Sequence, residues 1–149
     1  MTGAVPPHPV LRAYYATQHD HAAFVRSLFD RTAPQYDRAN AVFSLGTGGR
    51  YRRHALAAAG LRPGMRVLDV AVGTGLLADA ARHIQGASAD IIGVDVSAGM
   101  LCAACQRLDI ALIQALVEAL PLQDACIDFI TMGYALRHVS DLGVAFREF

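Results

Sequence analysis

The sequence predicts an α/β fold built on a mostly parallel sheet. After residue 64, short runs rich in Val, Leu and Ile alternate with stretches whose apolar residues repeat at helical spacing. Strands that alternate with helices pair in parallel, and helices then cover both faces of the sheet. The first of these strands runs into the sequence VGTG, and the second ends at Asp95, 22 residues after Gly73. A glycine turn after one strand and an acid at the end of the next predict a ligand site at one edge of the sheet.

The composition narrows the class of protein. The chain has 149 residues, of which 54% are hydrophobic and 17% charged, and this suits one globular domain. Its formal net charge is 0, so no basic excess favours nucleic acid, and we expect no nucleic-acid partner. No apolar run approaches the roughly 20 residues that span a bilayer, and the first residues do not read as an export signal. Three cysteines argue against a disulfide framework and predict a cytoplasmic protein.

The first part of the chain, residues 1–63, is predicted to be helical and to precede the α/β domain, residues 64–149. Three prolines in residues 1–9 predict a loose leader. A helical pattern follows over residues 10–32, and Pro34 is expected to end that helix. Shorter helices and a glycine-rich turn then lead to the sequence LRPG, which marks the domain boundary.

The α/β domain is predicted to contain four strands with helices after the first, second and fourth. Gly86 is placed to end the first of these helices, and Ser97 is placed to cap the start of the next. The last helix is predicted over residues 140–149. The predicted strands are 66–71, 91–96, 110–115 and 127–134.

The turn Gly73-Thr74-Gly75 joins the first strand to its helix. Glycines let the backbone turn sharply and let a ligand approach the main chain without meeting a Cβ atom. The start of the helix offers unpaired N–H groups to an anionic group. Asp95, at the carboxyl end of the neighbouring strand, can accept hydrogen bonds from two ribose hydroxyls. Together these features predict a ligand with an adenosine-like ribose and an anionic or polar tail.

Two cofactors fit this description. Gly73, Gly75 and Ala78 match the pattern G-x-G-x-x-G/A, and Asp95 lies at the expected distance, so a dinucleotide-dependent oxidoreductase stays open. S-adenosylmethionine (SAM) would place its methionine carboxylate near the turn and its ribose on Asp95. Asp69 favours SAM, because an acid is unfavourable beside a pyrophosphate and favourable beside an ammonium group. A tight turn with no ligand is the third possibility.

Four segments resemble one family. They are FDRTAPQYDRAN with SLGTGGRYRR, then VLDVAVGTG, GVDVSAGML and EALPLQDACIDFITMGYALRHVSD. From residue 29 onward the chain resembles the class I SAM-dependent methyltransferases, and within them the ubiquinone/menaquinone-biosynthesis C-methyltransferases. The resemblance implies a Rossmann-like α/β fold, SAM as cofactor, and methylation of a small aromatic or quinone-like acceptor at carbon. A quinone acceptor would imply at most peripheral contact with a membrane.

The resemblance also implies roles for single residues. His138 would act as the base that removes a phenolic proton, and Arg137 would stabilise the phenolate. Tyr36 and Asp37 would cover the substrate pocket. The alternative for His138 is a histidine next to a helix that is satisfied by a backbone group, and the alternative for this tyrosine-aspartate pair is ordinary helix packing. No metal site is predicted. The residues expected to bind SAM are Asp69, Gly73, Thr74, Gly75, Asp95, Val96 and Leu116.

The chain also departs from the family pattern. Leu116 stands where the family normally carries Asp or Asn to bond the adenine amino group, and His138 stands where the quinone enzymes usually have asparagine. The family sheet continues beyond four strands, whereas this sequence ends at Phe149. We therefore expect a truncated methyltransferase whose fourth strand is an open edge, with self-association through that edge. A non-catalytic remnant of a methyltransferase is a further possibility.

Overall fold

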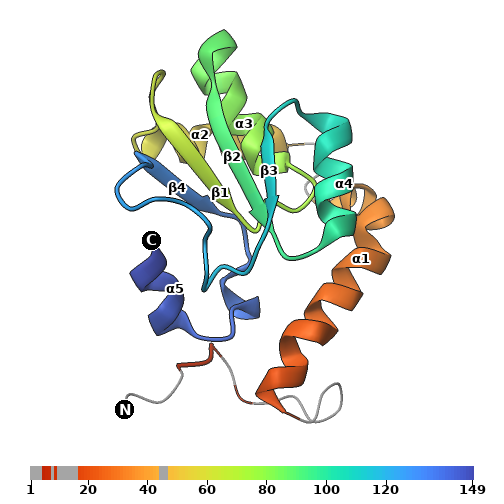
Figure 1. Cartoon of the computed structure of the whole chain (residues 1–149). Coiled ribbons are helices and arrows are strands. Elements are labelled where there is room, and N and C mark those ends of the chain that lie inside the picture. Colours follow the sequence, from red (N-terminus) through yellow and green to blue (C-terminus); the bar gives the residue numbers. More distant parts are fainter. Residues whose placement is uncertain (1–4, 8, 10–16, 44–46) are drawn as a thin grey trace.

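The computed structural model contains one four-stranded parallel sheet, in the order β3-β2-β1-β4 (Figure 1). It describes residues 5–7, 9, 17–43 and 47–149, with the side chains of residues 18, 19, 22 and 34–43 outside that description. The strands are β1 (Arg66–Val70), β2 (Asp90–Asp95), β3 (Ala111–Gln114) and β4 (Phe129–Met132). The helices are α1 (Gln18–Phe43), α2 (Gly48–Ala58), α3 (Leu76–Gln85), α4 (Ala98–Arg107) and α5 (Leu142–Glu148), with short 3₁₀ helices η1 (Gly86–Ser88) and η2 (Leu136–His138).

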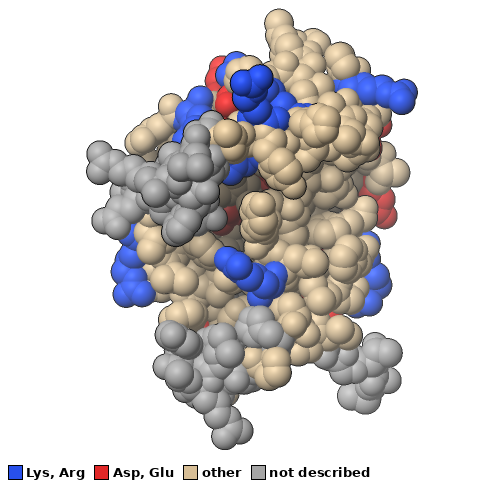
Figure 2. All heavy atoms as spheres, turned by 180° about the vertical axis from the view of Figure 1, so that it is seen from behind, with Lys and Arg blue, Asp and Glu red and all other residues tan. Residues whose placement is uncertain are grey.

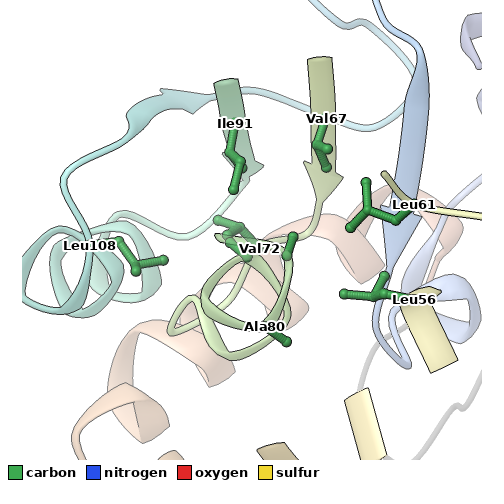
Figure 3. Packing of buried hydrophobic residues seen from close by; sticks show 9 residues of the cluster. Leu56, Leu61, Val67, Val72, Ala80, Ile91 and Leu108 are labelled. Carbon is green, nitrogen blue, oxygen red and sulfur yellow. The ribbon is translucent and has the colours of Figure 1, made fainter. Parts of the chain in front are cut away.

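One face of the sheet packs against helices. Side chains alternate between the two faces of a strand, so Val67 of β1 and Ile91 of β2 share this face. They meet Leu56 of α2 and Ala80 of α3, and Leu108 joins them from the end of α4 (Figure 3). Small residues on α3 let this helix lie close to the strands. This cluster is the larger of the two apolar cores.

The second face of the sheet has a different cover. Leu68, Val70 and Val94 point to this side and pack against the segment 115–127 and against Phe149. The segment between β3 and β4 contains no helix, and α5 follows β4 only as a short helix. In the part of the chain that the structure describes, the predicted helical cover over this second face is therefore present only at the end of α5. Apolar residues in an irregular segment exclude water from the strands in place of helices.

The predicted strands are confirmed to within two residues at each end, and so is the parallel α/β fold. Gly86 follows α3 with φ +75° and ψ −149°, a conformation that favours glycine but differs from the left-handed helical one usual for a glycine that ends a helix. Ser97 caps α4, because its Oγ accepts a hydrogen bond from the Met100 N–H at 3.1 Å. Gly86 and Ser97 therefore mark the end of α3 and the start of α4, as the sequence predicts.

Helix α1 is longer than predicted. It continues through Pro34 to Phe43, whereas the sequence analysis ended it at the proline, and much of the predicted start falls outside the described residues. A proline inside a helix removes one hydrogen bond and costs about 3 kcal/mol. Packing offsets that cost, because α1 lies against α4 and buries Val25 and Ala33.

Strand β4 lies at one end of the sheet. It pairs with β1, and in the described part of the chain no strand pairs with its other side. The expected open edge is therefore present, while self-association through it stays a prediction. No helix among the described residues is both long and apolar enough to cross a bilayer.

Basic side chains are scattered over the face shown in Figure 2 rather than gathered into one patch. Such a distribution offers no stripe of positive charge along which a phosphate backbone would bind. The absence of a nucleic-acid partner stays a prediction.

Candidate functional site

Two neighbouring cavities lie at the carboxyl edge of the sheet. The first lies between the ends of β1, β2 and β4 and is walled on one side by α1. The second lies between α2, α3, β1 and β4. Ala71 and Gly73 line both, so the glycine turn separates them. The predicted site residues that line the first cavity are Gly73, Asp95, Val96, Leu116, Arg137 and His138.

Asp95 and the glycine turn are directly bonded. The N–H of Gly73 donates to Asp95 Oδ2 at 2.9 Å, and the N–H of Ser97 donates to Asp95 Oδ1 at 2.9 Å. Burial raises the pKa of Asp95, and these amides offset part of that rise. Each carboxylate oxygen keeps a further lone pair for a ligand hydroxyl. The two features that the sequence singled out therefore face one cavity.

The two glycines of the turn have different roles. Gly73 has φ +56°, and a Cβ atom built on it would meet no atom closer than Ala71 O at 4.0 Å, so a ligand can approach its backbone. Gly75 has φ +84°, and its Cβ would lie 3.1 Å from Leu108 Cδ1 and 3.6 Å from Ala104 Cα. Gly75 lines neither of the two cavities and allows α4 to pack against the turn.

Asp69 faces the second cavity. Strand alternation places it on the helix-covered side, where it is 1% exposed and its Oδ1 accepts a hydrogen bond from Thr131 Oγ1 at 2.8 Å. Its Oδ2 is buried without a hydrogen bond of normal geometry. Burial raises the pKa of Asp69 to about 7, and the Thr131 hydroxyl offsets only part of that effect. Asp69 and Asp95 therefore reach the sheet edge from different sides of the turn.

Thr74 also belongs to the second cavity. It is buried, and its carbonyl oxygen accepts a hydrogen bond from Arg107 Nε at 2.8 Å, which ties the turn to the end of α4. Helix α2 contributes Tyr51 and Arg52 to the same cavity.

Arg137 and His138 lie together on η2, beside the first cavity. Arg137 Nε donates to His138 Nε2 at 3.1 Å, an assignment that requires Nε2 to carry a lone pair. The His138 ring also packs edge-on against Phe29 of α1, with 5.2 Å between centroids and 86° between planes. The predicted pair is therefore adjacent to the cavity that holds Asp95.

Leu116 lines the first cavity with 44% of its surface exposed. The neighbouring Val117 and Val96 are also apolar, so this side of the cavity suits the face of a flat ring. Glu118 is the polar group that the sequence analysis missed here. Its Oε1 accepts hydrogen bonds from the N–H groups of Ser140 at 2.7 Å and Asp141 at 3.2 Å. An acid beside the sequence LP was the available signal, but nothing local linked it to residues 22 positions later.

Two residues at strand ends adopt a conformation that favours glycine. Ala71 has φ 54° and Tyr134 has φ 59°, and both line the two cavities. Non-glycine residues in this region carry strain and cluster at binding sites. Tyr134 is 80% exposed, so its ring stands at the mouth of the site.

Two predicted residues cannot be placed as side chains. Tyr36 and Asp37 lie on α1, but their side chains lie outside the described residues. Among the described residues, no group of three or more His, Cys, Asp or Glu side chains is arranged to hold a metal ion.

Comparisons with known proteins point to one family. The ubiE/COQ5 methyltransferase family matches residues 16–149. The ubiquinone/menaquinone biosynthesis C-methyltransferase UbiE of Xylella fastidiosa (strain M12) is 36% identical over 136 residues, which cover 87% of this chain and 54% of that protein. This chain therefore spans about half the length of such curated relatives.

Solved structures share the fold. A SAM-dependent methyltransferase from Aquifex aeolicus matches with a TM-score of 0.61 and 24% identity, covering 65% of this chain and 55% of that one. Magnesium protoporphyrin IX methyltransferase from Synechocystis PCC 6803, solved with bound SAM, matches with a TM-score of 0.60 and 21% identity, covering 79% and 64%. At these identities the likeness establishes the Rossmann-like methyltransferase fold.

Proposed function

This chain belongs to the ubiE/COQ5 methyltransferase family, and on that premise we propose that it binds SAM and serves methyl transfer to a small aromatic or quinone-like acceptor, at carbon. One observation supports the proposal above the others. The Gly73 amide and the Asp95 carboxylate are bonded at 2.9 Å and line one cavity together with Arg137 and His138. A dinucleotide-dependent oxidoreductase is not favoured by any relative described above.

The described residues fit the cofactor. The half-buried Gly73 has room for a ligand where a side chain would stand, and Asp95 has lone pairs for ribose hydroxyls. Val96, Leu116 and Val117 offer apolar surface to the nucleobase. Leu116 cannot accept a hydrogen bond from the adenine amino group, so shape and stacking would recognise the base.

SAM, when bound, supplies a methyl group on a positively charged sulfur that is already activated toward a nucleophile. The protein then has to orient the acceptor and exclude water. The Arg137 guanidinium would stabilise a phenolate, and His138 would accept the phenolic proton at Nε2. Because Arg137 Nε donates to that nitrogen in this structure, the guanidinium would have to turn to the phenolate oxygen before Nε2 could accept the proton. The arrangement at 3.1 Å keeps the guanidinium next to that ring.

We also propose that the helical segment 1–63 covers the acceptor, as the resemblance implies, with Tyr36 and Asp37 facing it. Helix α1 supports this arrangement, since its residues Val25 and Phe29 line the first cavity.

Calorimetric titration of the chain with SAM, S-adenosylhomocysteine and NAD tests the proposed cofactor. We expect both sulfur nucleosides to bind and NAD to give no heat. Asp95→Asn should weaken SAM binding roughly tenfold or more, because a charged acceptor of the ribose hydroxyls is lost. Asp109→Asn, an exposed acid outside both cavities, is the matched control. Tighter binding of NAD than of SAM would overturn the assignment.

His138→Ala tests the proposed base. In a methyl-transfer assay we expect turnover to fall by about 10² to 10⁴, the usual contribution of a general base. The dissociation constant of SAM should stay at the wild-type value, because the proposed contact of the ring is with the acceptor, whereas the proposed ribose contact is with Asp95. An unchanged rate would remove His138 from the chemistry.

A further inference from the structure

Asp30 of α1 forms a contact for which the function described so far has no use. Its Oδ1 accepts a hydrogen bond from Ser97 Oγ at 2.5 Å and another from the Gly99 N–H at 3.0 Å. Ser97 is fully buried, and its Oγ meanwhile accepts from the Met100 N–H. A hydroxyl has one proton to donate, and the Ser97 hydroxyl donates it to Asp30. The start of α4 is thus bonded by its own cap and by a carboxylate 67 residues earlier in the chain.

The missing side chain of Gly99 is a second feature of this contact, and it does not depend on charge. A Cβ atom built on Gly99 would lie 3.0 Å from both Asp30 Cα and Asp30 O. Gly99 lies in the first turn of α4, where alanine would otherwise favour the helix. The missing side chain therefore serves the close approach of α1, since a methyl group would push against its backbone.

The contact reaches the cofactor cavity from two sides. Ser97 donates its backbone N–H to Asp95 Oδ1 at 2.9 Å. Ser97 therefore links Asp30 to Asp95, the residue proposed to bind the ribose. Phe29, next to Asp30 in the chain, lines the first cavity and packs against His138. The position of α1 thus determines where one wall of the cavity stands.

We propose that Asp30 is a positioning residue: its carboxylate fixes α1 on Ser97 and Gly99 of α4, and this sets the cavity wall formed by Val25 and Phe29 beside Asp95 and His138. The part that concerns the cofactor rests on the proposed function, whereas the seating of α1 does not. The hydrogen bonds lower the pKa of Asp30, in keeping with a charged carboxylate at a helix start.

Hydrogen exchange without ligand, measured by mass spectrometry, tests the seating of α1. In Asp30→Ala we expect amides of the described part of α1 to exchange roughly tenfold faster, because two hydrogen bonds to a charged group are lost. Gly99→Ala should have the same effect through its methyl group, which would meet the Cα and carbonyl oxygen of residue 30. Asp30→Asn keeps an acceptor oxygen and should restore most of the protection. Arg31→Ala, an exposed neighbour on α1, is the control.

Calorimetry with SAM on the same variants tests the link to the cavity. We expect Asp30→Ala and Gly99→Ala to weaken SAM binding roughly three- to tenfold, with Asp30→Asn and Arg31→Ala near the wild-type value. Unchanged exchange in both variants would overturn the seating role. Faster exchange with unchanged SAM affinity would overturn the link to the cofactor. If the wild-type chain bound no SAM, the proposed function would fail, while the exchange data would still decide the role of Asp30.

Discussion

Asp69 and Asp95 are both buried carboxylates near the glycine turn, but their surroundings differ. Asp95 accepts hydrogen bonds from two backbone N–H groups, and these partly stabilise its charged form. Asp69 has one hydroxyl from Thr131 and apolar neighbours, so burial dominates and its pKa rises to about 7. Burial therefore raises the pKa of both carboxyl groups, and at Asp95 the backbone amides offset part of that rise.

The stability of the fold should depend on pH through Asp69. Between about pH 4 and pH 7 the unfolded chain releases the Asp69 proton while the folded chain keeps it, so the free energy of unfolding falls as the pH rises. The shift from 3.8 to about 7 corresponds to roughly 4 kcal/mol. Urea denaturation from pH 4 to pH 8 should show this decline in the wild-type chain and a flatter profile in Asp69→Asn. Equal slopes in both proteins would contradict the assignment, with Asp109→Asn as control.

The two turn glycines should respond differently to alanine. Gly73→Ala should cost about 1–2 kcal/mol for its left-handed backbone, and its methyl group should hinder SAM. Gly75→Ala carries the same backbone cost and also presses on Leu108, so we expect about 3 kcal/mol or more. Chemical denaturation and calorimetry with SAM measure the two effects. Equal stability of both variants would show that α4 is not packed tightly on the turn.

At the scale of secondary structure, the strands were the most predictable elements. Val, Leu and Ile runs bounded by glycine or acid determine them locally, and a cap such as Ser97 acts within one turn of its helix. The length of α1 could not be predicted in this way, because packing on α4 outweighs the cost of Pro34. The cover over Leu68 and Val70 likewise depends on a segment with no regular pattern.

The candidate site was predictable where it follows strand ends. Asp95, Gly73 and the pair Arg137-His138 meet at one cavity because parallel strands bring their carboxyl ends to the same edge. To predict which cavity Asp69 faces, the alternation of side chains along β1 must also be considered. This alternation puts Asp69 with Val67 on the helix-covered face. Contacts between distant segments, such as those of Glu118 and Asp30, leave no local pattern in the sequence.

For the whole molecule, the side of β4 that pairs with no strand in the described part of the chain should cause self-association in solution. Its backbone N–H and C=O groups on that side meet no strand in the described part of the chain, and such edges pair with other chains. Light scattering coupled to size exclusion should give a mass above that of one chain, and the mass should increase with concentration. A monodisperse monomer that unfolds cooperatively at every concentration would contradict this expectation.

Helix α4 touches the site at both of its ends. At the start, Ser97 donates to Asp95. At the other end, Arg107 donates to the carbonyl oxygen of Thr74, and Leu108 lies where a side chain on Gly75 would stand. Ten residues with a rise of about 1.5 Å each fix the spacing between these contacts, and removing one residue would also rotate one end by about 100°. A change in the number of residues in this helix should therefore release one half of the site.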